Sequence, residues 1–236
     1  MMISVCIATY NGASYIQEQL GSILPQLGPA DEVIVSDDAS TDGTLALVEA
    51  FKSPILKVVK GPCKGSPVLN FENALRHASG DIIFLSDQDD RWEERKVARM
   101  VEALAEADCV VSDCYVTDGA LNVTAASFYE LNATRSGRMY NLLRKNGYLG
   151  CCMAFRREVL EKSMPFPAGI PMHDIWIGNV AAFWFRTKFI DDRLIRFRRH
   201  SRNSSVTARK SPFSCWRKLE FRWLIVRALG GLFFRR

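Results

Sequence analysis

Residues 81 to 92 have the sequence Asp81-Ile82-Ile83-Phe84-Leu85-Ser86-Asp87-Gln88-Asp89-Asp90-Arg91-Trp92. The apolar first half has the length expected of a strand that is buried on both faces. Asp87, Asp89 and Asp90 follow it, and carboxylates this close together repel one another unless a cation or hydrogen-bond donors lie between them. If the backbone stays extended here, Asp87 and Asp89 point to the same side.

A divalent cation is one way to satisfy this acidic segment. Mg²⁺ takes oxygen ligands and commonly bridges one or two carboxylates to substrate phosphates. The competing interpretation is a polar turn before a helix that begins near Trp92. For an isolated Asp-x-Asp that interpretation would be preferred, so the rest of the chain has to decide between the two.

Strands and helices alternate in the chain before the acidic segment. Such alternation predicts a mostly parallel, doubly wound α/β sheet with helices on both faces. In sheets of this type ligands bind at the carboxyl ends of the strands, where Tyr10-Asn11, Asp37-Asp38 and the acidic segment lie. The expected strands cover residues 3–8, 32–36, 55–59 and 81–85, and the expected helices cover residues 14–24, 44–51 and 70–77.

The chain after the acidic segment is less regular. A proline-rich loop at residues 165–171 delivers His173-Asp174-Ile175-Trp176 onto a helix. The stretch 147–155 carries glycines of the kind that permit close approach of another backbone. Further helices are expected at residues 92–106 and 157–163, and further strands at residues 109–113, 147–155 and 189–197.

Composition limits the class of protein. A chain of 236 residues, 48% of them hydrophobic, suits one α/β domain with an appendage. Seven cysteines without a CxxC pair predict reduced thiols in a cytosolic protein. We expect no signal peptide, and no apolar stretch reaches the roughly 18 residues that a membrane span needs.

Two common nucleotide-binding classes are disfavoured by the loop after the first strand. No Gly-x-Gly-x-x-Gly follows residues 3–8, and no Gly-x-x-x-x-Gly-Lys occurs in the chain. A dinucleotide oxidoreductase and a P-loop enzyme would each need one of these motifs to hold phosphates.

The motifs, taken together, resemble glycosyltransferase family 2, whose members are nucleotide-sugar transferases with the GT-A fold. Ser86 to Trp92 and His173 to Trp176 look most like its bacterial rhamnosyltransferase-like branch. The matching segments are collinear over residues 3–206: Ala8 to Gly12, Val35 to Thr44, Asn70-Phe71 with Ala74-Leu75, Phe84 to Trp92, Gly150 to Met153, His173 to Trp176, and Phe197 to Asn203.

The resemblance implies inverting transfer of a sugar from a nucleoside diphosphate donor, such as dTDP-rhamnose or a UDP-sugar. The acceptor would be a hydroxyl of a glycan or a lipid-linked saccharide in bacterial surface polysaccharide synthesis. Residues 1–112 would be the nucleotide-binding half and residues 113–206 the acceptor-binding half. The implied site consists of Ala8, Thr9, Tyr10, Asp38, Asn70 and Asp87 at the donor, Asp89, Asp90 and His200 at Mg²⁺ or Mn²⁺, and Asp174 as general base.

Several alternatives stay open. A sugar nucleotidyltransferase would need a glycine-rich, basic triphosphate loop, which residues 9–12 do not supply. A nucleotide-sugar-binding protein with an inactive site is the non-enzymatic alternative. Asp174 could instead be a helix N-cap, and His200 an ordinary hydrogen-bonded loop histidine. Nucleic acid binding is disfavoured because the basic residues from Arg198 onward alternate with aliphatic surface.

The last part of the chain, residues 207–236, is a basic tail. The net charge is +5, yet from Arg193 onward 13 Lys and Arg face one acidic residue, Glu220. Pro212 could begin a helix, and Trp216, Leu219, Trp223 and Val226 form one apolar stripe on it. We expect this helix to lie on the inner face of the cytoplasmic membrane. The alternative is that it packs on the catalytic domain or on a second copy of the chain in a homodimer.

Overall fold

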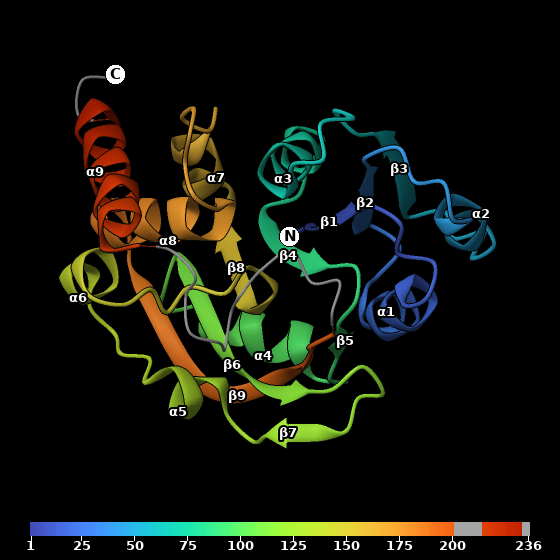
Figure 1. Cartoon of the computed structure of the whole chain (residues 1–236). Coiled ribbons are helices and arrows are strands. Elements are labelled where there is room, and N and C mark those ends of the chain that lie inside the picture. Colours follow the sequence, from blue (N-terminus) through green and yellow to red (C-terminus); the bar gives the residue numbers. More distant parts are fainter. Residues whose placement is uncertain (201–213, 233–236) are drawn as a thin grey trace.

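The protein is described by a computed structural model that covers residues 1–200 and 214–232. One sheet organises it, with strand order β3-β2-β1-β4-β8-β6-β9-β5 and β7 beside β6 (Figure 1). The strands are β1 Ile3–Thr9, β2 Glu32–Asp37, β3 Leu56–Lys60, β4 Ile82–Asp87, β5 Arg91–Trp92, β6 Cys109–Thr117, β7 Val123–Ala125, β8 Met153–Arg156 and β9 Thr187–Arg198.

The helices follow the predicted order closely. Figure 1 shows α3 and α1 on opposite sides of the N-terminal strands, and α3, α7 and α8 pack together on one face. The α-helices are α1 Ile16–Ile23, α2 Thr44–Glu49, α3 Pro67–Arg76, α4 Lys96–Ala103, α5 Phe128–Asn132, α6 Arg138–Leu143, α7 Arg157–Ser163, α8 His173–Trp184 and α9 Cys215–Leu232, and the 3-10 turns are η1 Leu24–Gln26 and η2 Gly150–Cys152.

The parallel order predicted from the first part of the chain is present in β3, β2, β1 and β4. Their register places Thr9 beside Asp37 and Ala8 beside Asp87. The second part of the sheet is mixed, because β8 runs antiparallel to both β4 and β6, whereas β9 is parallel to β6. The α/β fold class is therefore confirmed, and the carboxyl ends of β1, β2 and β4 meet at one edge.

Two elements differ from the sequence prediction. The helix expected from residue 92 begins at Lys96, because Arg91 and Trp92 pair with β9 instead. The strand expected over residues 147–155 is split into η2 and the short strand β8. Gly150 lies in η2, and a Cβ there would lie 3.0 Å from Nε2 of His173, so a small residue suits this position.

The C-terminal helix α9 is partly buried. Ile225, Leu229 and Leu232 are buried, and α9 packs on α8. The predicted apolar stripe faces away from the protein, with exposed fractions of 83% for Trp216, 54% for Leu219, 58% for Trp223 and 47% for Val226. Pro212 and the boundary near residue 206 lie outside the described residues. Within the described ranges, none of the helices has both the length and the apolar character to cross a bilayer.

Candidate active site

The acidic segment ends β4 and turns back along the edge of the sheet. Asp87 is the last residue of β4, and the chain turns at Gln88 and Asp89. Gln88 closes this turn against β1, because its Oε1 accepts from Tyr10 N at 2.9 Å and its Nε2 donates to Tyr10 O at 3.1 Å. A Cβ at Gly12 would lie 2.4 Å from Gln88 Oε1, so a larger residue there would require the Gln88 side chain to shift. Because the chain turns directly after Asp87, the alternation of side chains between the two faces of the strand ends at that residue, and it does not extend to Asp89.

Asp89 meets the C-terminal loop. Its Oδ2 lies 2.9 Å from Nε2 of His200, and the His200 ring stacks on Tyr15 with centroids 4.8 Å apart. Two of the three predicted metal ligands are thus brought together by β4, α1 and the end of β9. The Asp89 carboxylate is an oxygen ligand of the kind that Mg²⁺ and Mn²⁺ prefer, and the His200 imidazole is a softer nitrogen ligand beside it.

Asp90, the third predicted metal ligand, belongs to a different group. It is fully buried, and a ligand atom from each of Asp87, Asp90 and Cys151 lies within 4.8 Å of the others. Asp90 Oδ1 accepts from Arg198 N at 2.9 Å, whereas Oδ2 has no hydrogen-bond partner among the described residues. Burial raises the pKa of Asp87 to about 8, and the charges of Asp89 and Asp174 add to that effect.

Two buried cations hold the acidic segment in place. Arg198 donates through Nε to Asp89 O at 2.7 Å and through Nη1 to Gly119 O at 2.6 Å, and it forms an ion pair with Glu18. Lys96 is completely buried and donates to Cys151 O at 2.6 Å. Burial lowers the pKa of Lys96 to about 8. Lys96 therefore connects the start of α4 to the η2 turn.

The predicted donor residues converge at the ends of β1 and β2. Thr9 is buried and donates to Asp37 Oδ1 at 3.0 Å, whereas Tyr10 is 54% exposed. Asp38 is buried, and its carboxylate accepts from the backbone N–H groups of Lys64 and Gly65 at 3.2 and 2.7 Å. In this structure Asp38 thus fixes the loop before α3.

Ala8 and Asn70 complete the predicted donor side. Ala8 is half-buried and pairs with Asp87 in the sheet. Asn70 is buried, accepts from Ser36 Oγ at 2.6 Å and donates to Thr9 O at 3.1 Å. Asn70 therefore links the end of β1 to the end of β2 through its side-chain amide.

Asp174 lies in the first turn of α8. The N-cap of this helix is Met172, so the interpretation of Asp174 as the N-cap is wrong. Its Oδ1 accepts from Ile175 N at 2.7 Å and its Oδ2 from Gly150 N at 3.1 Å. The side chain is 8% exposed, and burial raises its pKa to about 6 although the N–H donors oppose this. Asp174 is therefore mostly ionised at neutral pH and can accept a proton.

Sequence reasoning assigned no role to Lys96, Cys151 or Arg198. Lys96 follows the acidic segment by only a few residues, but a surface lysine of a helix gives the same pattern. Cys151 and Arg198 lie within the matching segments Gly150 to Met153 and Phe197 to Asn203. Their contacts with Lys96 and Asp89 depend on how β8 and β9 pair in the sheet, which the sequence does not show.

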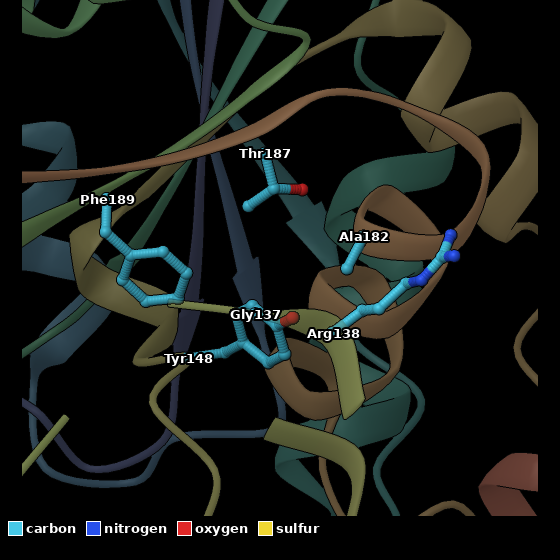
Figure 2. A pocket seen from close by; sticks show the side chains of 6 residues that line it. All are labelled: Gly137, Arg138, Tyr148, Ala182, Thr187 and Phe189. Carbon is cyan, nitrogen blue, oxygen red and sulfur yellow. The ribbon is translucent and has the colours of Figure 1, made fainter. Parts of the chain in front are cut away.

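A separate pocket lies far along α8 from Asp174. Figure 2 shows it between the start of α6, the end of α8 and the start of β9. Thr187, in its wall, pairs with Cys109 at the beginning of β6, which is the sheet edge opposite to the acidic segment. The pocket is lined by Gly137, Arg138, Tyr148, Ala182, Thr187 and Phe189.

Comparisons with known proteins agree with this geometry. The model of the family described as glycosyl transferase family 2 matches residues 4–164. The putative teichuronic acid biosynthesis glycosyltransferase TuaG of Bacillus subtilis is 25% identical over 100% of this chain and 91% of its own length. The dTDP-rhamnosyl transferase RfbG of Shigella flexneri is 26% identical over 90% of this chain and 78% of its own.

Solved structures give the same answer for the fold. Staphylococcus aureus TarS 1-349 in complex with UDP-GlcNAc matches with a TM-score of 0.71 at 21% identity, over 100% of this chain and 67% of TarS. The mannosyltransferase PcManGT from Pyrobaculum calidifontis, in complex with GDP-Man and Mn²⁺, matches with a TM-score of 0.64 at 25% identity, over 97% of this chain and 64% of its own. The family match covers most of the chain, and the sheet, its acidic edge and these neighbours agree with it: the chain belongs to glycosyltransferase family 2 and has the GT-A fold.

Proposed function

We propose that the chain is an inverting glycosyltransferase that moves a sugar from a nucleoside diphosphate donor to a hydroxyl of a glycan or a lipid-linked saccharide. Its place would be in the synthesis of a bacterial surface polysaccharide, at the inner face of the cytoplasmic membrane. The name of TuaG, which refers to teichuronic acid biosynthesis, supports this process. The name of RfbG and the TarS complex support dTDP-rhamnose or a UDP-sugar as donor.

One observation carries the proposal. Burial raises the pKa of Asp87, and the charges of Asp89 and Asp174 raise it further, so the carboxylate that contacts His200 and the basic carboxylate of α8 both act on the end of β4. Transfer from a diphosphate needs both parts. The carboxylate–imidazole pair, with a cation, would stabilise the negative charge that develops on the leaving diphosphate. The separate carboxylate would accept the proton of the acceptor hydroxyl.

Asp174 would act on the acceptor. Its carboxylate takes the proton of the acceptor hydroxyl as that oxygen attacks the anomeric carbon from the face opposite the diphosphate. The new carbon–oxygen bond forms as the bond to the diphosphate oxygen breaks, the electron pair leaves with the diphosphate, and the anomeric configuration inverts. The two N–H donors from Gly150 and Ile175 fix the direction of the carboxylate, and general base catalysis of this kind contributes about 10²–10⁴-fold.

Asp89 and His200 would hold Mg²⁺ or Mn²⁺. Their contact at 2.9 Å supports a cation site, whereas Asp90 belongs to the separate group with Asp87 and Cys151. When bound, the cation would offset the charge of the diphosphate as a Lewis acid. Thr9, Tyr10 and Asp38 would lie along the base, and Asp87 on the ribose side.

The stripe on α9 supports peripheral contact with the membrane. One face of the helix, with Ile225, Leu229 and Leu232, is buried, and α9 packs on α8. The stripe lies on the exposed side of the helix. Arg217, Lys218, Arg222 and Arg227 belong to the same helix, and Glu220 is its one acidic residue. Tryptophans at headgroup depth with cations on anionic lipid are typical of such helices.

Release of nucleoside diphosphate is the test of the activity. The full chain with Mn²⁺ would be offered dTDP-rhamnose, UDP-glucose and UDP-GlcNAc, with and without membrane extracts that contain lipid-linked saccharides. We expect release from one donor that depends on the acceptor fraction and is lost in Asp174→Asn. Release from none of these donors, or release that Asp174→Asn leaves unchanged, would contradict the proposal.

A further inference from the structure

Tyr15, the N-cap residue of α1, contacts the segment that ends β9. Its ring stacks on the imidazole of His200, with centroids 4.8 Å apart and an interplanar angle of 22°. The guanidinium carbon of Arg198 lies 4.7 Å from the centroid of the same ring. Tyr15 is half-buried, and its side chain makes no capping hydrogen bond to α1. The contacts of its ring are thus with the end of β9, and the start of α1 does not depend on them.

The ring of His200 is oriented by contacts of its side chain, because the sheet ends before it. β9 ends at Arg198, two residues earlier, and Arg199 N donates to Thr117 O at 2.9 Å. The side chain of His200 is 12% exposed. The contact of its Nε2 with Asp89 Oδ2 fixes one ring atom, whereas a stack fixes the plane of the ring.

The plane of the ring decides whether His200 can bind a cation. A ring nitrogen binds a metal through a lone pair that lies in the ring plane, and groups around a metal site commonly fix the orientation of such a ring. A cation bound between Asp89 and Nε2 would take the place of their direct contact, so that contact could no longer orient the ring. The stack on Tyr15 uses the face of the ring and not the lone pair of Nε2, so it would persist in the loaded site.

Arg198 is held by contacts that do not involve Tyr15. It is 4% exposed and forms an ion pair with Glu18 of α1. Its Nε donates to Asp89 O at 2.7 Å, and its Nη1 donates to Gly119 O at 2.6 Å. The Tyr15 ring can therefore be removed without loss of the contact between the end of β9 and α1.

We propose that Tyr15 is a positioning residue of the metal site: its ring holds the imidazole of His200 in the orientation in which Nε2 and the carboxylate of Asp89 bind one cation. In this role Tyr15 touches neither the cation nor the donor. It acts through His200, and its phenol hydroxyl is not required. This role rests on the proposed function of Asp89 and His200 as metal ligands.

The test replaces the ring of Tyr15 and measures the affinity for Mn²⁺. Tyr15→Phe keeps the aromatic face and removes only the hydroxyl, whereas Tyr15→Leu and Tyr15→Gln both remove the ring. Binding of Mn²⁺ to the full chain in the presence of dTDP or UDP would be measured by electron paramagnetic resonance of the free ion. We expect affinity near wild type for Tyr15→Phe. For the two variants without a ring we expect a loss of about tenfold, the lower end of the effect of groups that orient a metal ligand.

Three further measurements separate positioning from a general structural effect. Tyr140→Leu should bind Mn²⁺ like wild type, because Tyr140 is also half-buried with a cation, Arg135, 5.7 Å from its ring centroid, but it lies in α6. In the metal-free protein the NMR signals of the labelled His200 ring should move in Tyr15→Leu and stay near wild type in Tyr15→Phe. In the background of His200→Ala, Tyr15→Leu should cause no further loss of affinity, because the imidazole that it positions is gone.

The outcomes distinguish this inference from the proposed function. Wild-type affinity for Mn²⁺ in both Tyr15→Leu and Tyr15→Gln would overturn the role of Tyr15. A loss in Tyr15→Phe as large as that in Tyr15→Leu would overturn it too, and so would a loss from Tyr15→Leu that is undiminished when His200 is already alanine. Unchanged affinity for Mn²⁺ in both Asp89→Asn and His200→Ala would instead contradict the proposed metal site itself.

Discussion

Oδ2 of Asp89 lies 2.9 Å from Nε2 of His200, although 111 residues separate them in the chain. The contact exists because β5 pairs with β9, which returns the end of β9 to the acidic turn. Arg198 adds to it by donating to both Asp89 O and Gly119 O. A single contact thus joins the acidic segment to the last of the matching segments.

We expect Asp89→Asn to keep the fold and to lose metal-dependent binding of nucleoside diphosphate. The neutral amide retains the volume and a contact to His200 but removes the charge that a divalent cation needs. Calorimetry with dTDP or UDP and Mn²⁺ would show at least about a tenfold loss of affinity, equal to about 1.4 kcal/mol. His200→Ala should weaken binding in the same direction.

His77 offers a matched control for this experiment. It is exposed at the C-cap of α3, and its ring Nδ1 lies 2.8 Å from the carbonyl oxygen of Asn73, so His77→Ala should leave nucleotide binding unchanged. Unaltered affinity of Asp89→Asn in the presence of Mn²⁺ would rule Asp89 out as a metal ligand.

Asp174→Asn should lower turnover by about 10²–10⁴-fold while donor affinity stays near wild type. The Asn side chain keeps the size of Asp but cannot take a proton, and its one carbonyl oxygen can accept from only one of the two N–H donors, Gly150 or Ile175. Turnover would be measured under donor saturation and affinity by calorimetry. A loss of donor affinity would make Asp174 a binding or structural residue instead.

The pH profile of turnover provides a second measure of Asp174. Its pKa is raised to about 6, so the ionised, basic form predominates above that pH and disappears below it. We expect kcat to fall about tenfold for each pH unit below 6, as for loss of one essential base. A flat profile between pH 5 and 8 would contradict this assignment. Stability should be followed in parallel, so that acid unfolding is not mistaken for loss of the base.

Much of the fold could be predicted from local pattern, because four strands alternate with three helices between Ile3 and Asp87. The sequence also predicted that Asp89 lies just after a buried strand and that Asp174 lies at the start of a helix, as the structure has them. The resemblance already grouped His200 with Asp89, which it contacts, whereas the N–H partners of Asp174 could not be predicted. Lys96 lies at the start of a helix and gives no sequence signal of burial, and Asp90 separates from Asp89 only because the backbone turns at Gln88.

The buried Lys96 should be required for stability. Its Nζ satisfies Cys151 O and lies 3.9 Å from the Trp92 ring centroid. Lys96→Met keeps most of the side-chain volume but leaves the buried carbonyl unpaired, at a cost of about 1–3 kcal/mol. Denaturant unfolding would measure the loss. Lys188→Met is the control, because Lys188 pairs with Glu106 at the surface, and exposed pairs contribute about 0–1 kcal/mol. Equal stability of wild type and Lys96→Met would contradict the prediction.

The last prediction concerns the membrane contact of α9. Trp216 and Trp223 are 83% and 58% exposed, so Trp216→Gln with Trp223→Gln removes apolar surface from the stripe without disturbing Ile225, Leu229 or Leu232. We expect the wild-type chain to float with vesicles rich in anionic lipid at low salt, since each nearby cation contributes about 1 kcal/mol. It should float less with neutral vesicles or at high salt, because salt screens this attraction.

The double Trp variant should lose most of the flotation at low salt, because the interfacial anchor is gone although every cation remains. A double variant with Val123→Gln and Leu131→Gln is the matched control, since these side chains are 48% and 50% exposed but lie away from α9, in β7 and α5. It should float like wild type. Equal flotation of the Trp variant and wild type, or no flotation of wild type at low salt, would contradict membrane binding through the stripe. The stripe would then be expected to contact a protein, and sedimentation of the full chain would show whether that protein is a second copy.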